Sequence, residues 1–286
     1  MSYVAPSTIE EARASLASAP GARVFAGATD LLPQARAGRP LPGTLVDLKR
    51  IPGLVGVRHD GDDWVIGAAT SAAVVAAHGG LRAAFPGLTE GVGLIGSDQV
   101  QNRATIGGNL CNASPAADSG PPMVVNDAVA VVATDSGTRS LPVADLMAGP
   151  GRTTLGPAEF VVEFRIADPG PRRADAYLRL TPRTEMDIAV VGAAARVTLD
   201  EAGRCTDAAV VLGAVAPTVV AVDGIVDVLV GGTLDDDALE RAADLARAAC
   251  RPIDDKRGTK DYRVHIAGVL TRRALLVAAT RAGGAV

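Results

Sequence analysis

The segment ATIGGNLCNASPAADSGPP, residues 104–122, has the most distinctive composition in the chain. It belongs to a longer region, 91–122, in which Gly, Ser, Asn, Asp and Pro predominate. These residues punctuate loops rather than fill helices, so the composition predicts a long loop. A loop of this length inside a compact chain is more often functional than decorative. The region is therefore the first candidate for a site.

Two glycine turns stand out as possible anion sites. One is AGATD, residues 26–30, between a predicted strand and a predicted helix; the other is TIGGN, residues 105–109, inside the polar region. Small residues let backbone N–H groups approach an anion closely, and a helix start adds a favourable dipole. A pyrophosphate bridged by two such turns needs no metal and few cationic side chains. Either turn alone is more often only a tight turn, but their occurrence together favours a dinucleotide.

Common nucleotide and nucleophile motifs are missing from the sequence. No G-x-G-x-x-G opens a helix after the first strand, which leaves a Rossmann site unsupported. No G-x-x-x-x-G-K-[ST] and no G-x-S-x-G occur either. The remaining candidate ligand is a dinucleotide held by a different scaffold.

Composition excludes several classes of protein. The chain has 286 residues, a net charge of −4 and 48% hydrophobic residues, which is enough for one large domain or two ordinary ones and excludes a disordered chain. Mild acidity argues against nucleic-acid binding. Three scattered cysteines and three histidines show no metal-ligand spacing, so we expect no metal on this chain. The start, MSYVAPSTIEEA, is not a signal peptide, and no uncharged stretch approaches membrane-span length, so we expect a cytoplasmic protein.

The first part of the chain predicts a small βαβ unit. Ser7 to Glu10 form a capping-box pattern before an amphipathic helix, and a second, short helix begins near Leu31. Alternating or continuous apolar runs predict strands. The strands expected before residue 170 are 23–26, 44–48, 64–67, 128–133 and 159–166, with an Ala-rich helix from Ser71.

The second part of the chain predicts a separate α+β domain. ADPGP, residues 167–171, is the best candidate linker, and three strand-like runs follow at 176–180, 188–199 and 207–215. Acidic residues 235–237 are typical caps for a helix ending near Cys250. A final helix has an apolar face made by Ile266, Val269, Leu270, Ala274 and Val277. We therefore expect domains at 1–170 and 171–286.

Five segments together resemble the FAD-binding, or medium, subunit of the xanthine dehydrogenase and carbon monoxide dehydrogenase family of molybdenum hydroxylases. The resemblance covers almost the whole chain, and the TIGGN…SPAAD run is highly specific. The segments are AGATDLLPQARAG (26–38), ATIGGNLCNASPAADSGPP (104–122), LRLTPRTEMDIAVVGAAARVTL (178–199), GTLDDDALERAADLA (232–246) and DYRVHIAGVLTRRAL (261–275).

The resemblance implies an α+β, two-domain flavoprotein. Residues 1–170 would form an FAD-binding domain of the PCMH type, with a small βαβ subdomain and a mixed or antiparallel-sheet subdomain. Residues 171–286 would form a domain with a three-stranded antiparallel sheet and helices, similar to the carbon monoxide dehydrogenase flavoprotein C-terminal domain.

The resemblance also assigns cofactor contacts. The AGATD turn would wrap the FAD pyrophosphate, and the TIGGN turn would clasp it from the other side. Ile95, Phe160 and Val161 would lie against the flavin, Ser114 and Asp118 would match the family's ASPxxD segment, and Arg179 would replace a common Lys. In full, the implied contacts are Ala26, Gly27, Ala28, Thr29, Asp30, Leu31, Ile95, Ala104, Thr105, Ile106, Gly107, Gly108, Asn109, Ser114, Asp118, Phe160, Val161 and Arg179, with no catalytic residue.

Two positions depart from the family pattern. Ala28 replaces the second glycine of the common AGG turn, which is acceptable only if its φ is negative or the site leaves room for a methyl group. Asp30 stands where some carbon monoxide enzymes have a serine, so a carbon monoxide substrate is less favoured.

The function implied by the resemblance is electron transfer inside a larger enzyme. An iron–sulfur small subunit carrying [2Fe-2S] clusters would pass electrons to FAD here, after a molybdopterin-binding large subunit carrying the molybdenum-pterin cofactor oxidises the substrate. The assembly would be a dimer of heterotrimers. Two alternatives stay open: a self-contained FAD oxidase or reductase of the same fold, and a non-catalytic interaction subunit. A cation-rich stretch, 251–273, is either a solvated face or a partner contact.

Overall fold

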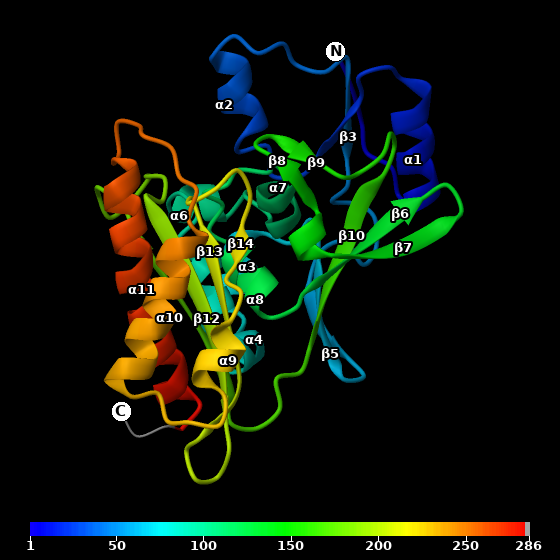
Figure 1. Ribbon diagram of the computed structural model, residues 1–286. Helices are drawn as coiled ribbons and strands as arrows, with labels where there is room; N and C mark the ends of the chain where they lie inside the picture. Colours follow the sequence, from blue (N-terminus) through cyan, green and yellow to red (C-terminus); the bar gives the residue numbers. More distant parts are fainter. Residues whose placement is uncertain (284–286) are drawn as a thin grey trace.

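The computed structural model describes residues 1–283 as two packed domains, shown in Figure 1. The N-terminal domain holds a small parallel sheet and a larger antiparallel one. The C-terminal domain holds a third sheet, which two long helices cover on the side away from the N-terminal domain. The α+β class expected from the sequence is confirmed.

The parallel sheet belongs to the expected βαβ unit. Its strand order is β1-β3-β2, and its elements are β1 (Ser2–Val4), α1 (Ile9–Ser18), β2 (Arg23–Phe25), α2 (Leu31–Arg36) and β3 (Thr44–Asp47). The N-cap lies one residue later than predicted: Thr8 Oγ1 accepts from the Glu11 N–H, and the Glu11 carboxylate accepts from the N–H and hydroxyl of the preceding residue, Ser7. Glu10, the acidic residue of the predicted capping box, also lies in the first turn of α1.

The larger sheet is antiparallel, and its central strand, β10 (Phe160–Ala167), is buried on both faces. The order of the sheet is β4-β5-β10-β6-β7, with β4 (Val57–Asp60), β5 (Asp63–Gly67), β6 (Val129–Thr134) and β7 (Gly137–Pro142). Phe160 and Val162 of β10 pack toward the βαβ unit, whereas Val161 and Phe164 pack toward the helices. A β-bulge between Val161 and Glu163 shifts the register and keeps Val161 and Phe164 in one core.

The composition predicts one long loop over the polar region 91–122, but the structure has short helices there. The region begins in the last turn of α5 (Pro86–Val92), which comes after α3 (Ala72–Ala77) and α4 (Gly79–Ala84). It contains α6 (Asp98–Gln101), α7 (Ile106–Cys111) and the start of α8 (Gly120–Val125). Local capping makes these short helices possible. Thr105 Oγ1 accepts from the Gly108 N–H, and the prolines of α8 occupy its first turn, where no intrahelical N–H is needed.

The C-terminal domain contains the three expected strands and a short fourth one. The sheet order is β11-β12-β13-β14, with β11 (Arg173–Leu180), β12 (Val191–Leu199), β13 (Cys205–Gly213) and β14 (Val220–Ala221). Helices α9 (Ile225–Leu229), α10 (Asp236–Ala249) and α11 (Lys260–Arg281) pack against it. A small hairpin, β8 (Met147–Gly149) and β9 (Arg152–Thr153), and a 3₁₀ turn, Val143–Asp145, complete the fold.

The buried face of α11 differs in part from the predicted one. Leu270 and Ala274 are buried as expected, whereas Ile266, Val269 and Val277 are only half-buried. Small residues such as Ala267 take the central positions because a short side chain lets the helix approach its neighbours closely.

The two domains are joined by a buried carboxylate. Asp175 on β11 is 1% exposed and accepts hydrogen bonds from the N–H groups of Gly87 (2.8 Å) and Leu88 (3.0 Å) and from Asn126 Nδ2 (2.7 Å). A side chain of the C-terminal domain thereby caps the N-terminus of α5 in the N-terminal domain. A Cβ on Gly87 would lie 2.7 Å from the Ala176 backbone, so the backbone segments of α5 and β11 meet without a side chain between them.

Asp175→Ala is expected to lower the free energy of unfolding by about 2–4 kcal/mol, because three buried donors lose their acceptor. Chemical denaturation measures this change. Asp135→Ala is the matched control: Asp135 is exposed in the β6–β7 turn, and its loss should change stability by less than about 0.5 kcal/mol. Equal effects of the two substitutions would contradict the bridging role of Asp175.

Asp175 also predicts a pH effect. Burial raises its pKa to about 6, despite hydrogen bonds from Gly87 and Asn126 that oppose the shift. A carboxyl group with a higher pKa in the folded state keeps its proton longer there, so its contribution to stability falls as pH rises from about 4 to about 6. Asp175→Asn should flatten the stability profile across this interval, by up to about 3 kcal/mol. Parallel profiles for both proteins would refute the assignment.

Candidate functional site

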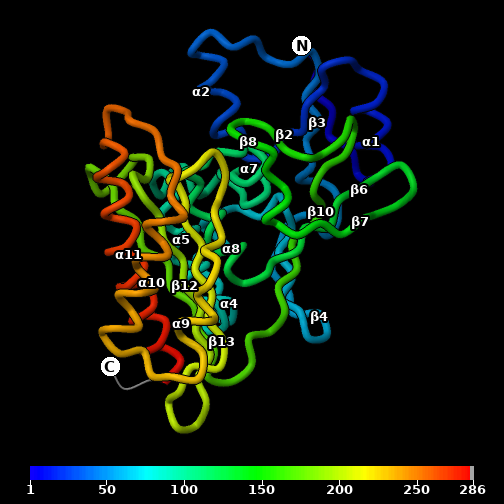
Figure 2. The backbone as a smooth tube through the Cα atoms, in the orientation of Figure 1, coloured from blue at the N-terminus to red at the C-terminus, as the bar shows by residue number. Residues whose placement is uncertain are grey.

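A cavity of about 680 Å³ lies between the βαβ unit and the helices of the N-terminal domain. Its volume is in the range of small-molecule and cofactor sites, about 300–1,000 Å³. In the backbone trace, α2 lies above α7, with β8 near both (Figure 2). Residues from α2, from α7 and from the β8–β9 turn line the cavity. Segments far apart in the sequence therefore share one wall.

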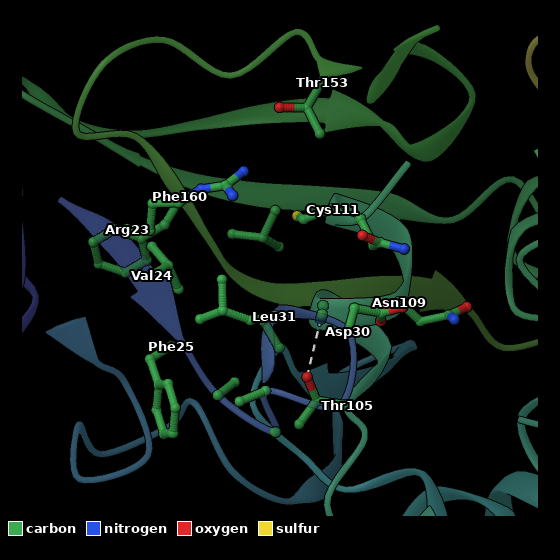
Figure 3. Close-up of a pocket in the computed structure, with 18 of the residues that line it drawn as sticks. Arg23, Val24, Phe25, Asp30, Leu31, Thr105, Asn109, Cys111, Thr153 and Phe160 are labelled. Carbon is green, nitrogen blue, oxygen red and sulfur yellow. Dashed lines mark hydrogen bonds between the residues drawn. The ribbon is translucent and has the colours of Figure 1, made fainter. Parts of the chain in front are cut away.

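Most of the residues assigned to the cofactor line this cavity. Figure 3 shows Asp30 and Leu31 beside Thr105 and Asn109. The lining members of the assigned set are Ala26, Gly27, Ala28, Thr29, Asp30, Leu31, Ile95, Ala104, Thr105, Gly107, Gly108, Asn109, Ser114, Phe160 and Val161.

Three assigned residues do not line the cavity. Ile106 is fully buried in the core below α7. Asp118 and Arg179 form a buried ion pair, with 2.6 Å between Oδ2 and Nη1, and Tyr177 donates to Asp118 Oδ1 at 2.9 Å. Burial raises the pKa of Asp118 to about 6, against the effect of Arg179 and Tyr177. The ion pair links the region after α7 to β11 of the other domain.

The two glycine turns are joined by a backbone contact. A Cβ on Gly27 would lie 1.9 Å from the Arg103 carbonyl oxygen and 3.0 Å from the Ala104 Cα. No side chain fits in that space, so position 27 must be glycine for the turns to meet. The first turn therefore rests directly on the residues that precede the second.

The first turn carries four consecutive backbone donors that are free. Within residues 1–283, the N–H groups of residues 27–30 have no protein acceptor. In the second turn, by contrast, Gly107 N–H donates to the Ala68 carbonyl (3.0 Å), Gly108 N–H to Thr105 Oγ1 (2.9 Å), and Asn109 N–H to the Thr105 carbonyl (2.9 Å). Three amides of the second turn are therefore engaged within its own helix and with a neighbouring segment, whereas that of Thr105 has no protein acceptor within residues 1–283.

Charges around the cavity favour an anion. Arg23 and Arg39 line it. Two acids, Asp30 and Glu159, line it too. Arg139 forms an ion pair with Glu159 and offsets its charge, which leaves two arginines against Asp30. The two arginines and the free amides of the first turn together suit a diphosphate.

The remaining wall is apolar and chemically inert. Ile95, Phe160 and Val161 are each less than one-tenth exposed, so they are fixed by the surrounding core. Burial raises the pKa of the Cys111 thiol to about 12, which keeps it protonated at neutral pH and unsuited to attack. This supports a binding site for a flat, apolar group rather than a nucleophilic centre.

Sequence reasoning missed several lining residues. The segment 150–158 closes one side of the cavity, and Phe25, Gln34 and Arg39 contribute from the βαβ unit. A possible indication was the glycine- and proline-rich run GPGRTTLGPAEF, which ends at the predicted strand.

Residues 1–283 contain neither a membrane-spanning helix nor a cluster of metal-ligating side chains. No helix there is long and apolar enough to cross a membrane. The same residues contain no group of three or more His, Cys, Asp or Glu side chains able to hold a metal ion.

Two known families match the chain. Residues 1–169 match the family described as FAD binding domain in molybdopterin dehydrogenase, and residues 176–278 match the CO dehydrogenase flavoprotein C-terminal domain.

Individual proteins match over nearly their full length. The carbon monoxide dehydrogenase medium chain of Afipia carboxidovorans is 35% identical, covering 98% of this chain and 97% of the relative. The xanthine dehydrogenase FAD-binding subunit of Escherichia coli O157:H7 is 28% identical, covering 99% and 97%. A solved structure of carbon monoxide dehydrogenase from Hydrogenophaga pseudoflava superposes with a TM-score of 0.93 at 33% identity, covering 98% of both chains.

Ala28 generates a stability prediction. Its φ is +60°, in the left-handed region where a Cβ is unfavourable. Ala28→Gly should therefore raise the free energy of unfolding by about 1 kcal/mol. Ala35→Gly, inside α2, is the control and should lower it by about 0.5–1 kcal/mol. Thermal or chemical denaturation compares them, and a destabilising Ala28→Gly would show that the turn is not strained.

Proposed function

The chain belongs to the family of FAD binding domains in molybdopterin dehydrogenases, and from this premise we propose that it holds FAD in the cavity and transfers electrons within a molybdenum hydroxylase. The observation that carries the proposal is the set of free N–H groups at residues 27–30 in a cavity of cofactor size. When bound, FAD supplies the ability to accept electrons singly and release them in pairs.

The residues present fit this cofactor. Residues 26–30 would wrap the pyrophosphate, with the free amides of residues 27–30 as its donors and Arg23 and Arg39 as the nearby cations. Ile95, Phe160 and Val161 would hold the isoalloxazine against the apolar wall. The second turn would act mainly by supporting the first, because most of its amides already have acceptors.

Asp118, Arg179 and Ile106 take a supporting part in the proposal. Their positions outside the cavity suit residues that fix its walls, with the Asp118–Arg179 pair tying the segment after α7 to the C-terminal domain. We retain the domain division at 170/171, which falls between β10 and β11.

Partner subunits follow from the proposed electron path. Proteins named medium chain or FAD-binding subunit are parts of larger enzymes. We propose an iron–sulfur small subunit with [2Fe-2S] clusters as the electron donor and a molybdopterin-binding large subunit as the site of substrate oxidation. A dimer of heterotrimers in the cytoplasm is the arrangement we propose.

Gly27→Ala tests the cofactor site. Its methyl group would collide with the Arg103 carbonyl, so the first turn should shift and the dissociation constant for FAD should rise on the order of 100-fold. FAD is measured by its visible absorbance and by quenching of flavin fluorescence, in the full chain and in any complex that co-purifies with it.

Gly79→Ala is the matched control, because a Cβ there meets open space. It should bind FAD like the unmodified protein. Absence of FAD from the unmodified chain and from its complexes, even after FAD is added, would overturn the proposed function.

A further inference from the structure

We propose that Lys49 is a positioning residue for the FAD turn: its ammonium group holds the Ala26 carbonyl and thereby directs the Gly27 N–H into the cavity. This inference rests on the proposed FAD function. Lys49 lies just after β3 and does not itself line the cavity.

The Lys49 side chain is held by three contacts. Nζ donates to the Ala26 carbonyl oxygen at 2.9 Å and to Asp47 Oδ1 at 2.7 Å, and it lies 4.5 Å from the centre of the Phe25 ring. Ala26 and Phe25 both line the cavity. One ammonium group therefore fixes a carbonyl and an aromatic ring that belong to the candidate site.

The hydrogen bond from Lys49 to the Ala26 carbonyl also fixes the direction of the Gly27 N–H. The carbonyl of Ala26 and the N–H of Gly27 belong to one planar trans peptide and point in opposite directions. Lys49 does not line the cavity, whereas Gly27 does. We therefore infer that the Gly27 N–H, which points away from Nζ, is turned toward the cavity. This N–H is among those without a protein acceptor in residues 1–283.

A buried carboxylate fixes Lys49 in turn. Asp47 is 4% exposed and accepts from the Lys49 backbone N–H (3.0 Å), from Lys49 Nζ and from the Tyr3 hydroxyl. Burial alone would raise the Asp47 pKa, but the hydrogen bonds from Lys49 and Tyr3 outweigh it and the pKa is lowered. Asp47 is therefore ionised at neutral pH and neutralises the ammonium charge locally.

Because Asp47 neutralises its charge, Lys49 is expected to orient the peptide rather than to attract the diphosphate from a distance. A free cation would attract the FAD diphosphate over a distance, and salt would weaken the attraction. A paired ammonium acts by orienting the peptide, an effect that salt changes little. The strained Ala28 adds a second distinction: if Lys49 holds the turn against this strain, relief of the strain should make Lys49 less necessary.

The test uses Lys49→Met in the full chain, purified with any partner subunits that accompany it. We expect the dissociation constant for FAD to rise about tenfold, and by the same factor at low and high salt. Lys256→Met is the control, because Lys256 is exposed and makes no ion pair within residues 1–283; it should leave FAD binding unchanged. In an Ala28→Gly background, the effect of Lys49→Met should be smaller.

Several outcomes would overturn the inference. They are unchanged FAD affinity in Lys49→Met, a loss that disappears at high salt, and an equal loss in the Ala28→Gly background. If Lys49→Met does not fold, Asp47→Asn provides the second variant: it leaves Lys49 in place but removes its charged anchor, and it should raise the dissociation constant about threefold. FAD binding by the unmodified protein keeps these outcomes distinct from a failure of the proposed function.

Discussion

The contact between Gly27 and the Arg103 carbonyl is the constraint on which the candidate site depends. It brings a turn of the βαβ unit against the backbone that leads into α7, with no side chain between them. If position 27 carried a Cβ, the two segments would separate and the cavity between them would change shape. Lys49 and Ala28 act on the same turn, one by holding its first carbonyl and the other by introducing strain.

The C-terminal domain contributes to this site from a distance. Asp175 binds the start of α5, and α5 leads within a few residues to Ile95 on the cavity wall. The Asp118–Arg179 pair makes a second connection, between the segment after α7 and β11. Buried polar links of this kind are costly unless fully paired, and both are paired here. The second domain therefore stabilises the walls of the cavity without lining it.

The sequence predicted the elements better than their local geometry. Polar residues around 91–122 indicated a loop, but Thr105 and the prolines of α8 satisfy helix ends that composition does not reveal. Likewise, both glycine turns were expected to offer amides, and only three-dimensional contacts, such as Gly107 with Ala68, determine which amides are already used. Lys49 belongs to no recognisable motif, because its importance comes from a carbonyl 23 residues away.

The sequence by itself determined the α+β class, the two glycine turns and the absence of metal-ligand spacing, because these follow from residue type and short-range spacing. Only the folded structure shows which amides of each turn lack an acceptor, that Ala28 is left-handed, and that Asp118 and Arg179 bind each other. These properties depend on what lies opposite each group across the fold. Backbone hydrogen bonds and buried charges are satisfied by long-range partners, and the order of residues along the chain does not specify them.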